Sequence, residues 1–446
     1  MNNTEPILQV GILTASEIVF VFKGKFFGSN QRTYSGRQVA VYRRGRILFD
    51  GKYLDELTFE PISMDDSFEL RNVVIGKGFH WQRMENQWFK GLLKFIVMEG
   101  KLTAINIIKT EDYLTSVISS EMSATASDEL LKAHAVISRS WLLNPIMNPV
   151  EPTNNHETHD VETRHALSLQ ENKYIKWYER DAHTHFDVCA DDHCQRYQGI
   201  TRASTVTVKM AIEATRGQVL MSDGKICDAR FSKSCGGITE AFENCWAPER
   251  HPYLVPVIDN NDVPAGFELD LTDNLNAEQW IRKSPPAYCN TTDKKILAQV
   301  LNNYDQETTD FYRWKVSYTQ AELSELLARR SGIDFGKIID LIPVKRGESG
   351  RIIELQIVGT KETIIVGKEL EIRKWLSNSH LYSSAFVVDK SEYLNDIAQR
   401  FTLTGAGWGH GVGLCQIGAA VMGEQGHKYN EILLHYFRGA ELKWIY

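Results

Sequence analysis

The feature that most constrains the fold is an abrupt change of periodicity near residue 110. Up to about residue 100 the chain consists of short alternating runs, such as "EIVFVF" and "RQVAVYRRGRILFD", separated by turns rich in Gly, Asn and Asp. Side chains alternate between the two faces of a strand, so these runs predict antiparallel hairpins in a small β-rich N-terminal domain over residues 1–100. After Thr110 the pattern becomes helical, with a first helix from Asp112 and a second from about Asp128 to Leu143.

The second helix carries clear signals for its start and its buried face. Ser127 is the expected N-cap, and Asp128 and Glu129 suit the positive end of the helix dipole. One apolar stripe predicts the side that packs into the core: Leu130, Ala133, Ile137 and Trp141. Residues 144–170, rich in Pro, Asn, Thr and His, predict an exposed insertion, and the "HETH" within it lacks the spacing of a zinc protease motif.

The rest of the chain mixes helical and strand patterns. Beyond about residue 264 we expect a helix from Ala321 to Arg330 and strands at "IIDLIPVKR", "RIIELQIVG" and "TIIVG". The last segment places a glycine-rich loop before a helix. The predicted fold class is therefore α+β: a mixed multi-domain chain with a helical core, antiparallel β regions and the small N-terminal β domain.

Composition excludes several classes of protein. With 446 residues the chain is long enough for two or three domains. The net charge of -7 argues against a general nucleic-acid binder, and no apolar run reaches the roughly 18 residues that a membrane span needs. The first residues lack the basic and apolar regions of a signal peptide, so we expect no export signal in the chain as given. Seven cysteines leave at least one thiol free, and the redox compartment stays open.

Glu121, in "VISSEMS", is a carboxylate on an apolar helix face. Leu114, Val117 and Ile118 precede it by seven, four and three residues, so all four side chains share one side of the helix. A bare carboxylate is costly to bury there, so we expect it to be paired, protonated or lining a cleft. The alternative without a functional role is that Glu121 forms an ion pair with Lys132 or Arg139.

A dense group of metal-ligand side chains follows in "HTHFDVCADDHC". Cys189, Cys194 and two of the three histidines His183, His185 and His193 would satisfy a tetrahedral zinc ion. Four protein ligands would make that site structural, whereas a catalytic zinc would need one position open. A polar surface loop is the alternative interpretation.

The glycine-rich "GAGWGHGVG" lacks the Lys-Ser/Thr of a phosphate-binding loop. Its glycines let the backbone approach either another segment or a ligand, with His410 held in the middle. By itself the pattern favours a packed turn over a site.

Three long motifs in order resemble the stage II sporulation protein D family, also called the SpoIID/LytB amidase-enhancer domain. They are "EDYLTSVISSEMSATASDELLKAHAVISRSWLL", "ATRGQVLMSDGKICDARFSKSCGGITEAFENCW" and "GAGWGHGVGLCQIGAAVMGEQGHKYNEILLHYFRGAEL". The resemblance spans residues 111 to 442 and implies a catalytic core over residues 101–263 and 386–446, with a mixed α/β region, residues 264–385, inserted between them. The chain departs from the pattern at Ser123, His134, Cys235, Cys415 and Ile417, where the family usually has Pro, Gln, another residue before the Gly-Gly, Ser and Tyr.

The resemblance implies a lytic transglycosylase acting on peptidoglycan glycan strands stripped of stem peptides. The family's catalytic acid maps onto Glu121, and its zinc-binding loop maps onto His183, Cys189, His193 and Cys194. Residues expected to bind substrate, from motif membership and chemical type, are Lys132, Arg139, Tyr197, Ser232, Ser234, Gly236, Gly237, His410 and Gln416. Trp246 is a candidate sugar-stacking aromatic, although core packing is its favoured role.

Two rival functions stay open. The family's second name implies a non-catalytic binding module that stimulates a cell-wall amidase, and the Cys/His loop alternatively implies a zinc-dependent hydrolase. With either function, the family resemblance implies a location in the cell envelope. If Glu121 is the catalytic acid, its apolar neighbours offer a means of keeping the carboxyl group protonated.

Overall fold

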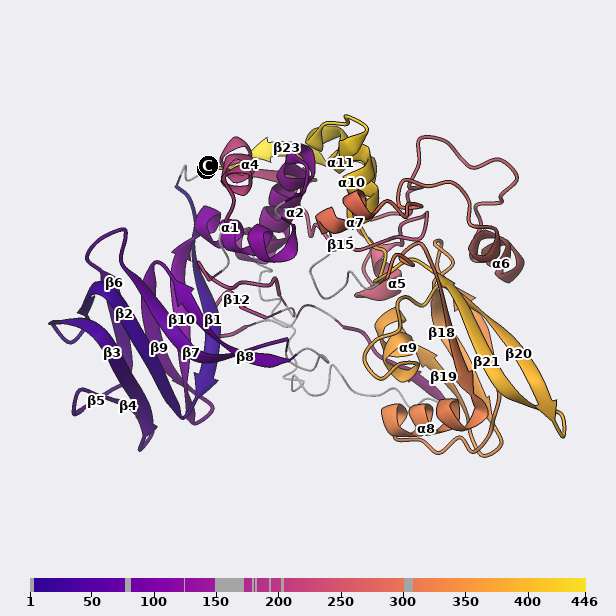
Figure 1. Cartoon of the computed structure of the whole chain (residues 1–446), viewed down its shortest axis with the longest axis horizontal. Coiled ribbons are helices and arrows are strands. Elements are labelled where there is room, and N and C mark those ends of the chain that lie inside the picture. Colours follow the sequence, from indigo (N-terminus) through magenta and orange to yellow (C-terminus); the bar gives the residue numbers. More distant parts are fainter. Residues whose placement is uncertain are drawn as a thin grey trace.

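The structure is a computed structural model that describes residues 4–76, 82–123, 125–148, 172–178, 180, 183–191, 194–201, 204–300 and 308–446. It is α+β, as the sequence predicts. An antiparallel sheet forms one end, smaller sheets with two covering helices form the other, and a group of helices lies between and above them (Figure 1). In the part of the chain that the structure describes, no helix has the length and apolarity needed to cross a bilayer.

The N-terminal sheet is made of the predicted hairpins. Its strands are β1 Ile7–Ala15, β2 Glu17–Gly28, β3 Arg32–Arg43, β4 Arg46–Phe49, β5 Lys52–Leu54, β6 Glu56–Pro61, β7 Ser67–Ile75, β8 Arg83–Phe89, β9 Leu92–Met98 and β10 Lys101–Lys109. Their order in space is β1-β10-β9-β6-β2-β3-β4-β5, and β7 pairs with β2 and β8. The Phe20 ring at its centre lies 5.0 Å from Phe95 and 5.6 Å from Phe59. This aromatic core follows from the alternation of buried and exposed residues along each strand.

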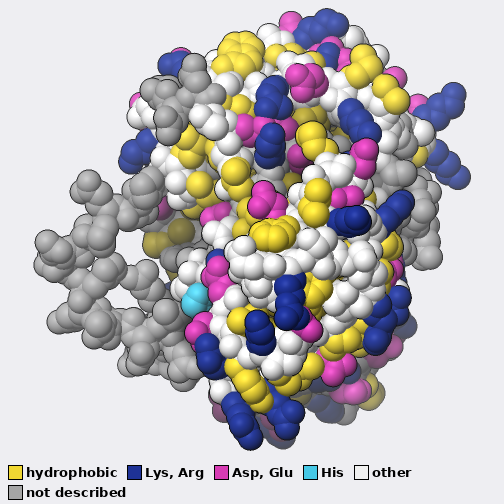
Figure 2. Space-filling view, turned by 90° about the vertical axis from the view of Figure 1, so that its left-hand side faces the viewer, with side chains coloured by type: hydrophobic (Ala, Val, Ile, Leu, Met, Phe, Trp, Pro, Cys, Tyr) yellow, Lys and Arg dark blue, Asp and Glu magenta, His cyan; other side chains and the backbone are white. Residues whose placement is uncertain are grey.

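The sheet extends nine residues beyond the boundary expected at residue 100. β10 ends at Lys109 and pairs antiparallel with β1, which places Ile7 opposite Lys109. Helix α1, Thr110–Glu121, begins at the next residue. A two-residue strand, β12 Val188–Cys189, adds to the free edge of β1 in parallel orientation. The first helix of the core is therefore anchored directly to the N-terminal sheet. Basic and acidic side chains are interspersed over this end of the molecule (Figure 2).

Helix α2, Asp128–Met147, is the centre of the helical group. It packs against α1, α4 Val206–Ala214, α10 Gln416–Glu424 and α11 Tyr429–Tyr436. Ser127 Oγ accepts the backbone N–H of Leu130, which confirms the predicted N-cap, and the predicted stripe is buried. The helix continues past Leu143 through Pro145 to Met147, further than predicted, and residues 149–170 of the expected insertion lie outside the described residues.

The third part of the chain forms two sheets around a separate core. The larger sheet, in the order β11-β19-β18-β17, contains β11 Lys173–Ile175, β17 Ile338–Arg346, β18 Ile352–Gly359 and β19 Thr363–Gly367. The other, β16-β21-β20, contains β16 Arg313–Thr319, β20 Phe386–Leu394 and β21 Ile397–Ala406. Helices α8 Gln320–Ser331 and α9 Glu369–Trp375 pack against them, and α8 begins with a Thr319/Glu322 capping box. Because β20 and β21 pair with β16, residues 386–406 are continuous with the region expected to end at residue 385.

Short elements connect the parts. They are β13 Gln218–Ser222, β14 Lys225–Ile226, β15 Phe231–Ser232, α5 Phe242–Cys245, α6 Asn274–Lys283, α7 Lys294–Val300, β22 Leu414–Cys415 and β23 Glu441–Trp444. Parallel pairing of β15 with β22 joins the second sequence motif to the third, and β23 pairs with β13 beside α4.

Candidate functional site

Glu121 is the last residue of α1 and is half-buried. The helix turns its apolar face inward, so Leu114, Val117 and Ile118 are fully buried, as the spacing predicts. At Met122 the backbone becomes extended and the helix ends. The carboxylate thus extends from a well-packed helix whose position is fixed by the core.

Residues Cys194 to Gln198 run alongside α1 and hold this carboxylate. The backbone N–H of Arg196 donates to Glu121 Oε1 at 3.3 Å, and the N–H of Gln198 donates to Ser116 Oγ at 3.2 Å. The Tyr197 ring stacks on Tyr113 with 4.9 Å between ring centroids. These contacts align one loop along the helix and fix one oxygen of Glu121 with a backbone donor.

Lys132 and Arg139 pair with other acids. Lys132 Nζ contacts Asp128 at 2.5 Å, and this hydrogen bond raises the pKa of Lys132. The guanidinium of Arg139 makes two hydrogen bonds to the Glu111 carboxylate, at 2.9 and 2.6 Å. Both cations are therefore paired with acids other than Glu121, so the alternative in which one of them forms an ion pair with Glu121 does not describe this structure.

The loop beside Glu121 also carries the predicted metal ligands. The ligand atoms of His183, Cys189 and Cys194 all lie within 4.8 Å of one another, and His183 Nε2 is 3.3 Å from Cys194 Sγ. A hydrogen bond with Cys189, together with burial, raises the pKa of the Cys194 thiol. Two sulfurs and one imidazole nitrogen form part of a tetrahedral zinc donor set. His193, the predicted fourth ligand, lies outside the described residues.

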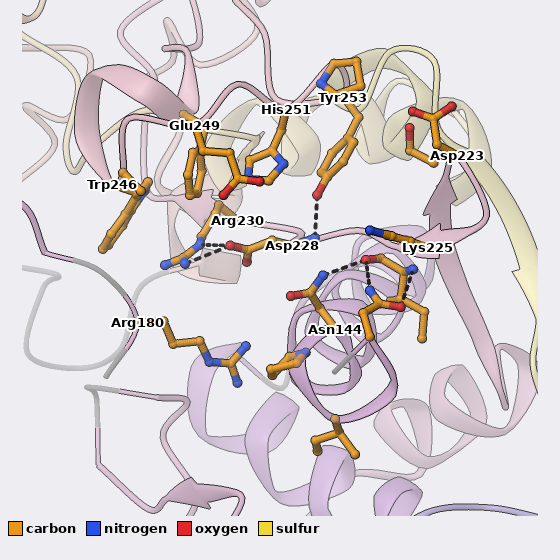
Figure 3. Close-up of a pocket in the computed structure, with 18 of the residues that line it drawn as sticks. Asn144, Arg180, Asp223, Lys225, Asp228, Arg230, Trp246, Glu249, His251 and Tyr253 are labelled. Atoms are coloured by element: carbon orange, nitrogen blue, oxygen red, sulfur yellow. Dashed lines mark hydrogen bonds and ion pairs between the residues drawn. The ribbon is translucent and has the colours of Figure 1, made fainter. Parts of the chain in front are cut away.

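A cavity of about 900 Å³ opens next to this cluster. His183 belongs to both, and Glu121 is not among the described residues that line the cavity. Among the lining side chains that Figure 3 shows are Arg180, Asp228, Arg230 and Trp246. The segment from His183 to Gln198 therefore contacts the cavity through His183 and Glu121 through the Arg196 N–H.

Charge and aromatic surface are combined in the cavity wall. Arg230 donates to Asp228 Oδ2 at 3.0 and 2.8 Å, and its guanidinium lies 4.3 Å from the centre of a Trp246 ring. Trp246 is half-buried: it packs against the main hydrophobic core, as the sequence favoured, and it also borders the cavity. Aromatic faces beside hydrogen-bonding groups suit the apolar faces and hydroxyls of a sugar.

Arg180 is a cavity residue that sequence reasoning missed. Pro145 has no N–H to donate to the carbonyl of Trp141 four residues earlier, and Arg180 Nη1 donates to that carbonyl at 2.7 Å instead. The Arg180 guanidinium also lies 3.6 Å from the centre of a Trp141 ring. The available signal was a proline two residues beyond the predicted end of the helix, because a helix that continues through a proline leaves one carbonyl in need of another donor.

Arg230 and Asp228 were also missed, although they lie in the second motif, "ICDARFSKSC". Their alternation with apolar residues was the signal that one side of this segment faces polar surroundings.

The third motif packs on the second through its glycines. A Cβ at Gly413 would lie 2.1 Å from the Arg230 carbonyl oxygen, and one at Gly407 would lie 2.8 Å from that of Ser234. Backbone bridges join Ser234 to Trp408 and Glu240 to Val412. Of the two alternatives left open by the sequence, the structure shows close approach of another segment.

His410 is held between these motifs and is partly exposed. Its Nδ1 accepts the backbone N–H of Val412 at 3.0 Å, and its ring meets Trp246 edge to face at 4.9 Å between ring centroids. Burial, then the Arg230 and Arg351 charges, lowers the pKa of His410 well below its usual value. His410 is therefore a neutral imidazole that supports Trp246 at the cavity edge.

The inserted region also braces the glycine-rich motif. The guanidinium of Arg351 is fully buried, and it donates to the carbonyl oxygens of Cys235 at 3.0 Å and Gly409 at 3.1 Å. A Cβ at Gly411 would lie 2.4 Å from this guanidinium. One role of the inserted region is thus to fix the backbone on which His410 is mounted.

Several residues expected to bind substrate have side chains that are buried in the core. Arg139 and Tyr197 are 0% exposed, and Tyr197 donates its hydroxyl to Asn106 Oδ1 at 2.6 Å. Gln416 is 5% exposed, and its Nε2 is 2.9 Å from Nε2 of His134. Their side chains have no surface to offer a sugar, because the core already uses it.

The Ser232 to Gly237 stretch is buried as well. Ser232 is 6% exposed and Ser234 is 0% exposed. Gly236 and Gly237 take positive φ, with Gly236 against the backbone of the third motif and Gly237 against Trp280. Of the candidates for substrate contact, Lys132 and His410 keep partial exposure.

Comparison with known proteins matches two parts of the chain to family models. The family model "Stage II sporulation protein" matches residues 98–221, and a domain of unknown function (DUF8618) matches residues 240–413. The stage II sporulation proteins D of Bacillus amyloliquefaciens and Bacillus subtilis (strain 168) are 24% and 22% identical over 341 and 343 residues. Those matches cover 76% of this chain, and 75% and 76% of the two relatives.

The amidase enhancer of Bacillus subtilis (strain 168) is 26% identical over 247 residues, which is 52% of this chain. The match spans about a third of that relative, 32% of its length. The family model covers both the helix that carries Glu121 and the loop that carries the metal-ligand cluster. The chain therefore contains a region, residues 98–221, that matches the stage II sporulation protein family model, and it is similar to stage II sporulation proteins D over 76% of its length.

Proposed function

We propose that the protein is a peptidoglycan lytic transglycosylase that cuts the bond between N-acetylmuramic acid and N-acetylglucosamine in denuded glycan strands. The observation that carries the proposal is the Glu121 carboxylate, which ends a buried helix inside the family region and accepts the Arg196 N–H. The match to this family model, with one relative named amidase enhancer, supports a cell-wall-related role.

One carboxylic acid suffices for this reaction. Glu121 first gives its proton to the glycosidic oxygen as the bond to C1 of the muramic acid breaks. The carboxylate then takes the proton of the muramyl 6-hydroxyl, whose oxygen bonds to C1 and gives a 1,6-anhydro end. Ordinary glycoside hydrolases need a second carboxylate for water or for a covalent intermediate. Here the Arg196 N–H holds Oε1, so Oε2 is the oxygen that carries the proton in this scheme.

The cavity supplies a surface for sugars of the glycan strand away from the bond that is cut, because Glu121 is not among the described residues that line it. Trp246 offers an aromatic face for a sugar ring, and Arg180 and Arg230 offer guanidinium groups for the lactyl carboxylate of muramic acid. Stripped strands expose that carboxylate, because no stem peptide is attached to it. The preference for denuded strands follows from this chemistry.

We infer that His183, Cys189, His193 and Cys194 hold a structural zinc ion. The bound ion would cross-link the loop and supply no reaction step, because four protein ligands leave no open position. The loop itself positions the Arg196 N–H on Glu121. In this proposal the zinc ligands take no part in the reaction and support the loop that contacts Glu121.

The test is digestion of denuded glycan strands followed by mass spectrometry of the new ends. Wild type is expected to release 1,6-anhydro ends, and Glu121→Gln to lose at least about 100-fold in rate, the usual contribution of a general acid. The matched control is Glu213→Gln, since the Glu213 side chain is 75% exposed on α4. Equal products from wild type and Glu121→Gln would sink the proposal. Hydrolysed ends that disappear on chelation, without unfolding, would instead indicate a zinc-dependent hydrolase.

A second function is favoured by the relative named amidase enhancer. In that case the protein is a cell-wall binding module that stimulates an amidase, and Glu121 is dispensable. Adding wild type and Glu121→Gln to a purified cell-wall amidase on intact sacculi separates the two functions. Stimulation by both proteins, with no anhydro ends, supports the binding module. Either function places the protein on the extracytoplasmic side, which fractionation of the native cell tests.

A further inference from the structure

A second cluster of metal-ligand side chains lies in the core and shares no residue with the His183/Cys189/Cys194 cluster. Sγ of Cys235, Cys289 and Cys415 and a carboxylate oxygen of Asp259 all lie within 4.8 Å of one another. All four residues are buried, with exposures of 0 to 2%. They come from four separate segments of the chain, and the fold alone brings them together.

The spacing of the sulfurs fits a shared ion. Two thiolates bound about 2.3 Å from a tetrahedral zinc ion lie about 3.8 Å apart. The Cys235 and Cys289 sulfurs are 3.7 Å apart, whereas a disulfide would hold them at about 2.05 Å.

Backbone donors surround the sulfurs. The N–H of Cys235 donates to Cys415 Sγ at 3.2 Å, and the N–H of Gly237 donates to Cys235 Sγ at 3.4 Å. Such donors stabilise the thiolate form, which is the form that binds a metal.

Asp259 provides an independent observation. Its Oδ2 accepts the N–H of Cys289 at 2.7 Å, and its Oδ1 accepts the hydroxyl of Tyr436 at 2.5 Å. A Cβ at Gly418 would lie 2.3 Å from Oδ1, so the helix α10 leaves room for this carboxylate. Over the described residues, the ion pairs include none to Asp259, and a carboxylate buried without a cation is costly.

We propose that Cys235, Asp259, Cys289 and Cys415 form a structural site for a divalent metal ion of the zinc class. Three sulfurs and one carboxylate oxygen give a closed tetrahedral set, with no open position for water or substrate. The cation supplies the positive partner that the buried Asp259 carboxylate otherwise lacks.

The position of the site gives it a purpose. Cys235 precedes the Gly-Gly of the second motif, and Cys415 caps the helix that follows the glycine-rich motif. Cys289 lies between α6 and α7 in the inserted region. The ion thus ties the inserted region to the two motifs that carry Arg230 and His410. The site is independent of the transglycosylase proposal, because no cluster residue lies at Glu121 or in the cavity lining.

The experiment counts metal in the purified full chain by mass spectrometry. The Cys189→Ser/Cys194→Ser protein removes the loop site, so its remaining metal reports on this cluster. One zinc ion per chain is expected there, and adding Cys289→Ser should remove it. Cys227→Ser, which replaces another fully buried thiol, is the matched control and should leave the count unchanged.

A second measurement does not depend on the folding of the Cys289→Ser variant. Exchange of cobalt into the Cys189→Ser/Cys194→Ser protein should give the thiolate-to-cobalt charge-transfer and tetrahedral d–d absorption bands. The proposal is overturned if that protein holds no metal and gives no such bands, or if peptide mapping finds Cys235 and Cys289 joined as a disulfide. Activity on glycan strands is recorded separately and does not decide whether this cluster holds a metal ion.

Discussion

The backbone N–H of Arg196 donates to Oε1 of Glu121 across 3.3 Å, although the two residues lie 75 positions apart. Arg196 follows Cys194 by two residues, and Cys194 belongs to the His183/Cys189/Cys194 cluster. Whatever holds that cluster together therefore also orients the proposed catalytic acid. The metal-ligand cluster therefore positions Glu121, and variants of the cluster test this role while Glu121 itself stays unchanged.

Replacing the cluster thiols, in Cys189→Ser/Cys194→Ser, should lower turnover on denuded glycan strands by about 10- to 100-fold, the usual effect of disturbing a supporting shell. The reason is that the Arg196 N–H would be held less firmly on the Glu121 carboxylate, so kcat should fall more than KM rises. Steady-state kinetics on strands of defined length measure this. Cys227→Ser is the control, and unchanged kcat in the double variant would contradict the positioning role.

The Glu111–Arg139 pair predicts a large stability effect far from the chemistry. Arg139 is fully buried and pairs through two nitrogens, while Glu111 also accepts the N–H of Gly217 and the hydroxyl of Tyr446. Arg139→Met leaves this carboxylate buried without its cation and should lower the free energy of unfolding by about 3–5 kcal/mol.

Lys132→Met is the control for that change. It removes a pair to a half-exposed Asp128 on the same helix and should cost about 0–1 kcal/mol. Denaturant titration followed by circular dichroism compares the two variants. Equal losses would contradict the distinction between the buried and the exposed pair.

Gly413→Ala should destabilise the contact between the second and third motifs. At φ +74 an alanine is strained by about 1–2 kcal/mol, and its Cβ would also lie 2.1 Å from the Arg230 carbonyl oxygen. The matched control is Gly439→Ala, at φ +79 with no atom within 4 Å of the added Cβ. We expect Gly413→Ala to lower the melting temperature clearly more than Gly439→Ala does. Similar melting temperatures would show that the close approach carries no energetic weight.

Local patterns in the sequence predicted local structure well. Alternation predicted the N-terminal hairpins, Ser127 predicted the start of α2, and the strands and helix of the inserted region lie where periodicity placed them. These features depend on neighbouring residues, so neighbours predict them. The predicted end of α2 was wrong because Arg180 satisfies the carbonyl that Pro145 leaves free. Arg180 lies far along the chain from that carbonyl, so no local pattern indicates the contact.

The site was predicted less completely, for the same physical reason. Glu121 and the converging His183, Cys189 and Cys194 are marked by motif and spacing. Whether Arg139, Tyr197 and Gln416 face a substrate or the core depends on contacts with Glu111, Tyr113 and His134, which no local pattern encodes. The Cys235/Asp259/Cys289/Cys415 cluster escaped notice because its members are spread over 181 positions of the sequence.

His134 should make stability depend on pH. Burial lowers the pKa of His134 to about 3, whereas an unfolded histidine titrates near 6.5. Between these values the unfolded chain binds a proton that the folded chain does not, so the free energy of unfolding falls as pH falls below 6.5. The slope from one such group reaches at most about 1.4 kcal/mol per pH unit.

The variant that tests this is His134→Gln, because Gln occupies this position in the family pattern and its amide can still meet Gln416. Its unfolding free energy should fall less steeply than that of wild type between pH 6 and pH 4, as followed by denaturant titration at each pH. His427→Gln, at a side chain 30% exposed, should keep the wild-type slope. If His134→Gln kept the wild-type slope, His134 would be protonated inside the fold. The His134 Nε2 would then donate a hydrogen bond to Gln416 instead of accepting one.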